Sequence, residues 1–357
     1  RREFASKGSA TSQMQKLSEL TTMRVGGEPA EIIVAKTRDD LIEATLEVWR
    51  SGDDWLILGG GSNLVVADEV DDLHVIKVET KGIQTFASAD GNKTLVRAQA
   101  GENWDDFVDF AIENGLAGVE GMAGIPGTVG AGPVQNIGAY GQELSDTFVR
   151  LEFVDYETHE VVILEKADLQ FGYRDSVIKR GRPGLITWVE LELQNFGGLS
   201  APISSGQIAG AFGAQLGDQL PLREVAESVK KMRATKGMLL SETDPDSVSC
   251  GSFFTNPIVS HTFARTLPEV SPRWETLEDD GLTVKLSAAW LIENSGINKG
   301  FSLPGSKAAI SSKHCLAITN RGGATAKEIV QLANYVQLQV SNRFGITLVP
   351  EPNLIGF

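Results

Sequence analysis

The sequence is poor in cysteine and histidine and contains no long apolar run. Cys250 and Cys315 are its only cysteines, too few for a disulfide framework, which favours a reducing, cytoplasmic compartment. Its four histidines are scattered, and neither Cys-x-x-Cys nor His-Glu-x-x-His spacing occurs, so no metal site is predicted. No stretch approaches the roughly 18 uninterrupted apolar residues of a membrane-spanning helix. Residues 1–19 are expected to form a tail that is either flexible or added for expression. Their polar start lacks the apolar core of a secretion signal.

The chain also lacks an excess of positive charge. Its 32 Lys and Arg residues are outnumbered by 47 Asp and Glu residues, which gives a formal net charge of −15. Nucleic acids and anionic membranes attract basic surfaces, so neither is a predicted partner, and no obligate protein partner is evident. Glycine, in contrast, is abundant, with 38 of 357 residues. Such an excess favours tight turns and backbone that comes close to a ligand.

Strands and amphipathic helices are mixed along the whole chain. Two helices are predicted to begin after the capping residues Thr37 and Thr325 and to end near Gly52 and Gly345. Apolar residues at helical spacing predict two more, around residues 104–112 and 221–236. Strands are predicted at residues 31–35, 55–58, 73–78 and 95–100, and around the alternating apolar positions of 149–153 and 189–193. This mixture predicts an α+β fold, and the length suits two or three domains.

Residues 58–64, Leu-Gly-Gly-Gly-Ser-Asn-Leu, form the first of two glycine-rich segments. They follow a predicted strand, and their N–H groups can converge on a phosphate or pyrophosphate. The Rossmann signature is absent, because its third glycine would fall at Leu64 and no amphipathic helix follows. An ordinary glycine-rich turn is the alternative interpretation of this segment.

Residues 124–141 form the second glycine-rich segment, with six glycines among eighteen residues. No lysine follows these glycines, so the segment is not a Walker-type phosphate loop. Thr128, Gln135, Asn136 and Tyr140 add polar contacts to a backbone that can approach a flat or extended ligand. A hinge loop is the alternative, but the two segments together favour an anionic dinucleotide held by main chain.

Three residues outside the glycine-rich segments are candidates for chemistry. Arg174 offers a planar guanidinium suited to a carboxylate, although a surface charge cluster with Asp175 is the alternative. The residues around Ser252 do not form the Gly-x-Ser-x-Gly motif of a nucleophile elbow, so the motif does not favour a hydrolase. Ser252 is instead a candidate proton donor beside a flavin. Glu351 stands rigidly between two prolines. A turn serine and a solvated acid are the alternatives for Ser252 and Glu351.

Taken together, these segments resemble the FAD-dependent UDP-N-acetylenolpyruvoylglucosamine reductases of bacterial peptidoglycan synthesis. The resemblance extends from about Leu20 to Phe357, and the long second glycine-rich segment is its most specific part. The motifs that carry it are residues 22–27, 58–64, 124–141, 173–176, 251–257 and 350–351.

The resemblance implies an α+β architecture: a vanillyl-alcohol-oxidase/PCMH-type FAD-binding fold plus an α+β substrate-binding domain. The first FAD-binding subdomain is expected at residues 20–85, with residues 348–357 returning to it. The second is expected at residues 86–235 and the substrate-binding domain at residues 236–347.

The implied reaction is the NADPH-dependent reduction of UDP-N-acetylglucosamine enolpyruvate to UDP-N-acetylmuramate, with bound FAD, NADPH as hydride donor and a UDP-sugar as substrate. Hydride would pass from reduced FAD to the enolpyruvyl β carbon. Ser252 would protonate the α carbon, while Arg174 and Glu351 would stabilise the enolic carboxylate. A serine suffices because this intermediate is strongly basic.

The resemblance also implies binding residues. Tyr173, Lys236 and Asn256 match positions expected at the substrate carboxylate, the nicotinamide or the diphosphate. Ser205 stands where members with the longer substrate domain usually have a tyrosine that covers the substrate. The implied FAD contacts are Arg24, Gly59, Gly60, Gly61, Ser62, Asn63, Leu64, Gly124, Ile125, Pro126, Gly127, Thr128, Gly130, Ala131, Gln135, Asn136, Gly138, Ala139 and Tyr140.

Two other functions compete with this reading. One is a different FAD oxidoreductase on the same fold, which oxidises an alcohol and uses oxygen, since a fold alone does not fix an activity. The other is a flavin-binding module without turnover. Flavin colour in the purified protein separates a flavoprotein from a flavin-free module.

Overall fold

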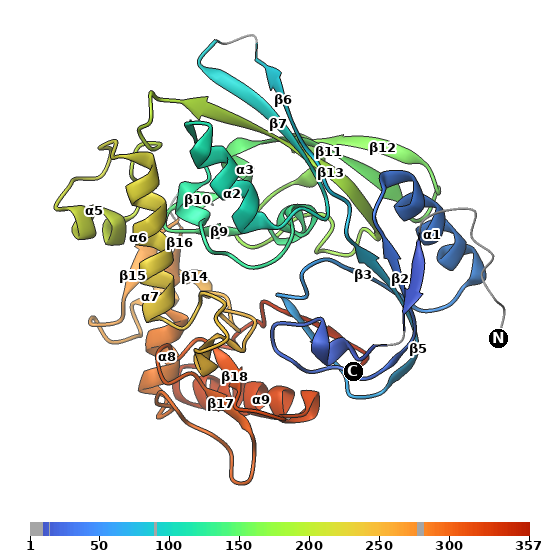
Figure 1. The fold of residues 1–357 in the computed structure, drawn as a ribbon. Helices are drawn as coiled ribbons and strands as arrows, with labels where there is room; N and C mark the ends of the chain where they lie inside the picture. The colour runs from blue at the N-terminus through green and yellow to red at the C-terminus, as the bar shows by residue number, and fades with distance from the viewer. Residues whose placement is uncertain (1–9, 14, 89–90, 277–281) are drawn as a thin grey trace. The chain divides into compact units, whose positions relative to one another are not determined.

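The computed structural model of the chain describes residues 10–13, 15–88, 91–276 and 282–357 (Figure 1). The chain divides into two compact units and passes between them several times. The first unit consists of Arg1–Gln15, Pro29–Gly61 and Asp71–Ala234, and the second of Lys16–Glu28, Ser62–Val70 and Thr235–Phe357. Among the helices of the described residues, none combines the length and apolar character that a bilayer crossing requires.

A four-stranded sheet of the first unit has the strand order β1-β2-β5-β3. These strands are β1 (Thr11–Gln13), β2 (Pro29–Ala35), β3 (Trp55–Leu58) and β5 (Val70–Val78). Helix α1 (Arg38–Ser51) connects β2 to β3. It begins where the Thr37 hydroxyl accepts a hydrogen bond from the Asp40 N–H, and it ends at Gly52, whose φ is 77°. Both ends confirm the sequence prediction.

A larger antiparallel sheet has the order β12-β11-β13-β7-β6, with β8 paired to the end of β13 (Figure 1). Along β13, Val189, Leu191 and Leu193 are almost fully buried, as their alternation predicted. The strands are β6 (Ile83–Ala87), β7 (Lys93–Gln99), β8 (Leu116–Ala117), β11 (Phe148–Asp155), β12 (Val161–Glu165) and β13 (Gly184–Asn195).

Helix α2 (Trp104–Glu113) packs into the core of the first unit through Phe107, Val108 and Ala111, after the side chain of Asn103 caps its N-terminus. Helix α6 (Leu222–Thr235) buries Val225 and Val229 in the same core. Both helices confirm the sequence prediction. The remaining elements of this unit are η2 (Glu120–Met122), η3 (Val129–Gln135), β9 (Gly138–Ala139), β10 (Gln142–Glu143), α3 (Leu144–Thr147), α4 (Lys166–Leu169) and α5 (Gly206–Phe212).

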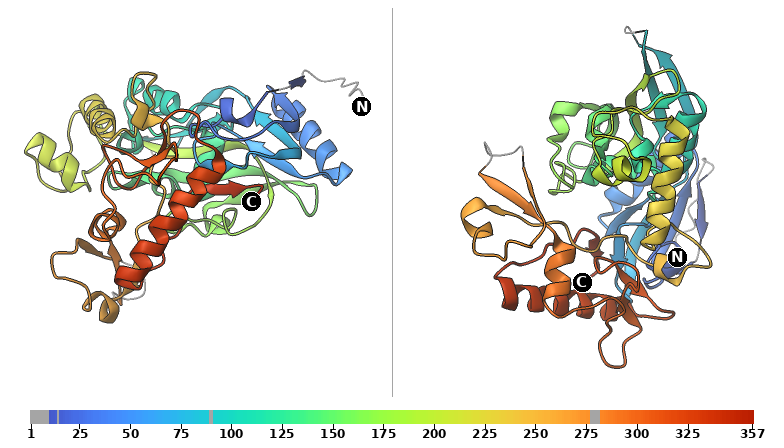
Figure 2. Two further views of the ribbon diagram at one scale, coloured as in Figure 1. Left: turned by 90° about the horizontal axis from the view of Figure 1, so that it is seen from below. Right: turned by 90° about the vertical axis from the view of Figure 1, so that its left-hand side faces the viewer.

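The second unit is organised around α9 (Ala326–Phe344), a long helix seen in red in Figure 2. A capping box of Thr325 and Glu328 starts the helix, and Gly345 ends it with a φ of 69°, as predicted. Its buried face joins Phe253 and Phe254 in a separate apolar core.

Strand β19 (Asn353–Ile355) pairs in parallel with β4 (Leu64–Val66), so a segment near Phe357 lies beside one that is distant in sequence. The antiparallel strands form one sheet of order β14-β16-β15 and one pair, β17-β18. The other elements of this unit are η1 (Leu17–Glu19), η4 (Pro245–Ser247), β14 (Ile258–Ser260), α7 (His261–Ala264), β15 (Arg273–Glu275), β16 (Thr283–Leu286), α8 (Ala288–Asn294), β17 (Ala308–Ile310) and β18 (Ile318–Asn320).

The range expected as a tail, residues 1–19, contains folded segments. Residues 1–9 and 14 lie outside the described residues, whereas Thr11–Gln13 pairs with β2 as strand β1. Leu17 is fully buried, and a Cβ on Gly26 would lie 2.8 Å from its Cβ. Leu17 is therefore a buried packing residue of the second unit.

Candidate active site

The two glycine-rich segments meet within the first unit. A Cβ on Gly60 would lie only 2.6 Å from the Cα of Gly127, and one on Gly59 would overlap the hydroxyl of Thr128. Any larger residue at these two positions would have to displace backbone or a packed side chain. The glycines are therefore required by close contact between the turn after β3 and the start of residues 124–141.

Main-chain donors of this turn are available for a ligand. Within the described part of the chain, the amide N–H groups of Gly60 and Gly61 have no protein acceptor. Gly61 adopts a left-handed conformation with a φ of 61°, as in the consecutive-amide nests that hold anions. Lys77 supports the turn from β5, because its ammonium donates to the carbonyl of Gly59 over 2.5 Å. This pattern fits the pyrophosphate of a dinucleotide.

The second glycine-rich segment folds around the short 3-10 helix η3. Gly130 lies against β7, where its N–H donates to the carbonyl of Ala100 over 2.9 Å and a Cβ would lie 2.5 Å from that of Ala100. The segment then reverses through Asn136 and Tyr140, which have positive φ angles of 46° and 48°. Glycine and left-handed turns thus bring a long stretch of main chain close to the sheet.

Arg233 was not predicted as a functional residue, yet it supports this segment directly. Its guanidinium is buried at the end of α6, and its Nε donates to the carbonyl of Gly124 over 3.1 Å. Burial lowers the pKa of Arg233, and burial also raises the pKa of the Tyr140 phenol. The only sequence signal was its position four residues after Val229, on the buried face of the helix.

Arg174 is held in place by main chain and by a carboxylate. One guanidinium nitrogen, Nη2, donates to the carbonyl of Gly138, while Nη1 lies 3.5 Å from both the carbonyl of Asn136 and Oε1 of Glu143. The Tyr173 ring lies against it, with its centroid 5.2 Å from Cζ. Because only 17% of the Arg174 side chain is exposed, it is not a member of a surface cluster.

Asp175, the alternative partner of Arg174, forms its ion pair with Arg180 instead. Arg174 itself has a positive φ of 53°, a conformation that is uncommon for a residue with a Cβ. The local fold therefore directs this guanidinium toward the second glycine-rich segment.

In the second unit, the segments that carry Ser252 and Glu351 lie side by side. The N–H of Glu351 donates to the carbonyl of Phe253 over 2.9 Å, and Phe254 forms an isolated β-bridge with Pro350. Both phenylalanines are almost fully buried and anchor the loop that follows Ser252. The structure thus brings these two predicted residues into one neighbourhood.

The predicted residues 62–64 belong to the same neighbourhood. The Asn63 side chain donates to the carbonyl of Glu351 over 3.2 Å, and the Cys250 thiol donates to the carbonyl of Leu64 over 3.2 Å. Burial raises the pKa of the Cys250 thiol to about 12, so this cysteine stays protonated and packs as a small apolar residue.

Three further predicted residues occupy separate places in the second unit. Arg24 has a φ of 54°, and its carbonyl accepts a hydrogen bond from the Asn320 amide over 3.2 Å. Asn256 accepts from the N–H of Ala288 over 2.9 Å at the start of α8. Lys236 lies near His314 and, with Lys299, contributes to lowering the pKa of that histidine to about 4, for which burial is the main cause.

Ser205 caps helix α5 of the first unit by accepting a hydrogen bond from the N–H of Ile208 over 3.5 Å. The neighbouring Ser204 donates to the carbonyl of Gly141 over 2.7 Å. The position expected to carry a covering tyrosine therefore has a structural role as a helix cap in this chain.

Known proteins with a similar sequence are reductases with an FAD-binding domain. Residues 244–355 match the sequence family of the UDP-N-acetylenolpyruvoylglucosamine reductase C-terminal domain. Residues 29–165 match the FAD binding domain family. The UDP-N-acetylenolpyruvoylglucosamine reductase of Leifsonia xyli is 48% identical over 370 residues, which cover 95% of this chain and 98% of the relative. The chain belongs to this reductase family.

Other members of the UDP-N-acetylenolpyruvoylglucosamine reductase family match the chain over nearly its whole length. The Thermobifida fusca reductase is 43% identical, with 95% of this chain and 96% of that protein covered. The Mycobacterium tuberculosis H37Rv protein is 42% identical, with 98% and 96% covered. The crystal structure of the Thermus caldophilus reductase superimposes with a TM-score of 0.64 at 25% identity, over 97% of this chain and 99% of that one.

The family resemblance expected from the motifs is thus confirmed. The chain is an FAD-dependent oxidoreductase with an α+β architecture, a vanillyl-alcohol-oxidase/PCMH-type FAD-binding fold plus an α+β substrate-binding domain. The free amides of Gly60 and Gly61 and the close glycine packing fit this cofactor.

Proposed function

We propose that this protein catalyses the NADPH-dependent reduction of UDP-N-acetylglucosamine enolpyruvate to UDP-N-acetylmuramate, a cytoplasmic step of peptidoglycan precursor synthesis. The observation that carries the proposal is the match along nearly the whole chain to reductases named for this substrate. The FAD-binding domain and the local contacts around Arg174, Ser252 and Glu351 support it.

Bound FAD would supply the hydride chemistry, by taking a hydride from NADPH and delivering it to the enolpyruvyl β carbon. The chain's part is to hold the cofactor through backbone groups of the two glycine-rich segments and through Arg24. The proposed contacts are Arg24, Gly59, Gly60, Gly61, Ser62, Asn63, Leu64, Gly124, Ile125, Pro126, Gly127, Thr128, Gly130, Ala131, Gln135, Asn136, Gly138, Ala139 and Tyr140.

Arg174 and Glu351 are proposed to stabilise the charge that develops when hydride adds to the β carbon. Negative charge then spreads over the α carbon and the carboxylate, and a fixed guanidinium neutralises it without reorganisation. The contacts of Arg174 with Gly138, Asn136 and Glu143 restrict its rotation, which supports such a role. Glu351 is fixed through its main chain, which pairs with Phe253.

Ser252 is proposed to deliver the proton to the α carbon. A hydroxyl is a weak acid, but a carbanion stabilised only as an enolate is basic enough to take its proton. The buried rings of Phe253 and Phe254 anchor the backbone that follows Ser252, which supports a fixed position for this residue.

Tyr173, Lys236 and Asn256 are proposed to bind the substrate or the nicotinamide. The Asn256 carbonyl oxygen is occupied by Ala288, so its NH2 group is the part that is oriented for an acceptor on a ligand. Lys236 is half-buried and supplies a positive charge for carboxylate or diphosphate.

We also propose the domain limits. The FAD-binding subdomains comprise residues 20–85 with 348–357, and residues 86–235, and the substrate-binding domain comprises residues 236–347. The family matches at residues 29–165 and 244–355 support a division of this kind.

Stopped-flow absorbance tests the function by separating its two half-reactions. NADPH alone is expected to bleach the flavin absorbance of the anaerobic enzyme, and the UDP-enolpyruvyl sugar is expected to restore it. Bleaching without restoration by the sugar, but with rapid restoration by oxygen, would instead indicate the oxidase. A colourless protein that does not take up FAD would contradict both.

A further inference from the structure

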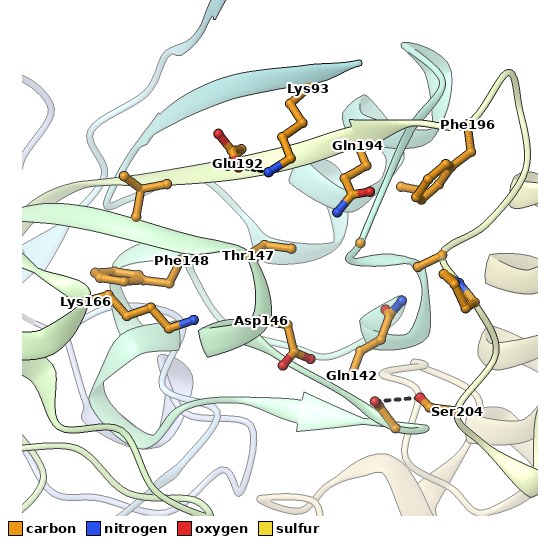
Figure 3. A pocket seen from close by; sticks show the side chains of 16 residues that line it. Lys93, Gln142, Asp146, Thr147, Phe148, Lys166, Glu192, Gln194, Phe196 and Ser204 are labelled. Atoms are coloured by element: carbon orange, nitrogen blue, oxygen red, sulfur yellow. Dashed lines mark hydrogen bonds and ion pairs between the residues drawn. The ribbon is translucent and has the colours of Figure 1, made fainter. Parts of the chain in front are cut away.

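A pocket of about 550 Å³ opens in the first unit (Figure 3). Its size is within the range of small-molecule sites. None of the residues proposed above for FAD, substrate or catalysis lines it. Its walls come from β7, β10, α3, the first residues of β11 and α4, the end of β13 and the loop before α5.

The charged groups of this pocket are unequally engaged. Lys93 and Glu192 neutralise each other in an ion pair of 2.7 Å, and Oδ2 of Asp146 accepts from the backbone N–H of Glu143 over 2.8 Å. The exposed ammonium of Lys166 forms no hydrogen bond or ion pair with any residue that the structure describes. Asp146 keeps its charge, because its donor is a neutral backbone N–H, so the formal charges of the lining balance. Lys166 is the charged lining residue whose side chain has no partner among the described residues, and its ammonium suits an anionic group on a ligand.

Polar groups of the pocket are available for hydroxyl groups. Gln142 uses its carbonyl oxygen to accept from the N–H of Gly121 over 2.6 Å, which leaves its NH2 group as a donor. The side-chain amide of Gln194 has no partner among the described residues. In Figure 3 the side chains of Gln194 and Gln142 point toward each other across the pocket. Paired donors and acceptors of this kind suit a polyhydroxylated molecule.

Two aromatic rings provide the apolar part of the lining. Phe148 is fixed by an edge-to-face contact with Phe171 at a centroid distance of 5.1 Å, and Phe196 lies near Gln194 in Figure 3. Rings next to amide and carboxylate groups accommodate the apolar C–H face of a sugar ring while its hydroxyls reach polar partners.

We propose that this pocket binds a small anionic carbohydrate, a sugar phosphate or a sugar acid. Its anionic group lies at Lys166, its hydroxyls contact Gln142, Gln194 and the free oxygen of Asp146, and its ring lies against Phe148 or Phe196. The pocket also contains Gly141, whose carbonyl accepts from Ser204. Because Gly141 ends the second glycine-rich segment, an occupant contacts that segment next to Tyr140, a proposed FAD contact that does not itself line the pocket.

Isothermal titration calorimetry on the full-length FAD-loaded protein tests this site. Glucose 6-phosphate and glucuronate represent the two sources of negative charge, with glucose and inorganic phosphate as partial ligands. We expect saturable binding of at least one sugar anion, about tenfold tighter than that of either partial ligand, because both the charge and the hydroxyls contribute.

The matched variants are Lys166→Met and Lys36→Met, since both lysines are exposed and only Lys166 lines the pocket. Lys166→Met is expected to weaken sugar-anion binding about tenfold, whereas the Lys36→Met variant is expected to bind the sugar anion as tightly as the unmodified protein. Gln194→Leu is expected to reduce the advantage of the sugar anion over inorganic phosphate. The proposal is overturned if neither sugar anion binds, if both lysine variants bind alike, or if phosphate alone binds as tightly as the sugar anions. All of these outcomes are independent of the reductase assay.

Discussion

Oε1 of Glu143 lies 3.5 Å from Nη1 of Arg174, while Oε2 of the same carboxylate accepts from the Asn136 side chain over 3.0 Å. One acid thus connects the guanidinium to the left-handed turn of the second glycine-rich segment. Asn136 is itself fixed, because its amide also donates to the carbonyl of Gly172 and its oxygen accepts from the N–H of Ser145. Glu143 is therefore expected to position Arg174 rather than to contact the substrate.

For Glu143→Gln, we expect flavin reduction by NADPH to stay unchanged and reoxidation by the UDP-enolpyruvyl sugar to slow about three- to tenfold. A partly exposed ion pair contributes about 1 kcal/mol, which sets this size. Single-turnover absorbance measures both steps. Glu160→Gln, at an exposed acid outside this network, is the control. Equal slowing of both half-reactions would show that the change acts on the fold.

For Ser252→Ala, flavin bleaching by NADPH should remain, and reoxidation by the sugar should slow about 10²–10⁴-fold, the usual contribution of a general acid. The neighbouring Cys250→Ala is the matched control, because its thiol is buried and its raised pKa keeps it protonated. Rapid reoxidation of the Ser252 variant would remove this serine as proton donor.

For Gly60→Ala, we expect loss of bound FAD and a lower free energy of unfolding, by about 1–3 kcal/mol, because the new methyl group meets the backbone of Gly127. Flavin absorbance per protein and urea unfolding measure the two effects. Gly210→Ala is the control, since a Cβ there has no neighbour within 4 Å in the middle of α5. If Gly60→Ala kept its flavin, the close contact between the two segments would not be required for binding.

For His314, the prediction concerns pH. Burial, with Lys236 and Lys299 nearby, lowers its pKa from 6.5 to about 4. Between these values the unfolded chain binds a proton that the folded chain does not, so stability falls as the pH drops from about 6.5 toward 4.

We therefore expect the protein to lose about 2 kcal/mol more than the His314→Gln variant when urea unfolding is compared at pH 7 and pH 5. Carboxylates whose pKa values are lowered in the fold, such as Asp246, affect both proteins equally. Parallel pH profiles would indicate that His314 titrates normally.

Much of this structure was accessible from the sequence, because its signals are local. Thr37 and Gly52 bracket α1, and the capping box at Thr325 starts α9. The glycine-rich segments were recognisable because close backbone contact leaves no alternative to glycine at Gly60. The family relationship, the FAD-binding fold and the enzyme class followed from those motifs.

Other parts depended on contacts that no local pattern encodes. Arg233 reaches Gly124 across more than a hundred residues, and Lys77 reaches Gly59 from a neighbouring strand. Helix η3 lies in a stretch where glycine and proline disfavour helix, so its packing against β13, β7, α2 and α3 is needed to explain it. The burial of Leu17 likewise depends on the absence of a side chain at Gly26.

The parallel pairing of β4 with β19 has a consequence for biosynthesis. On the ribosome, residues 64–66 emerge long before their hydrogen-bonding partners, residues 353–355, are translated. The edge of β4 is expected to stay open until then and to be a place where nascent chains associate wrongly. Deletion of residues 353–355 should therefore damage folding far more than their small number suggests.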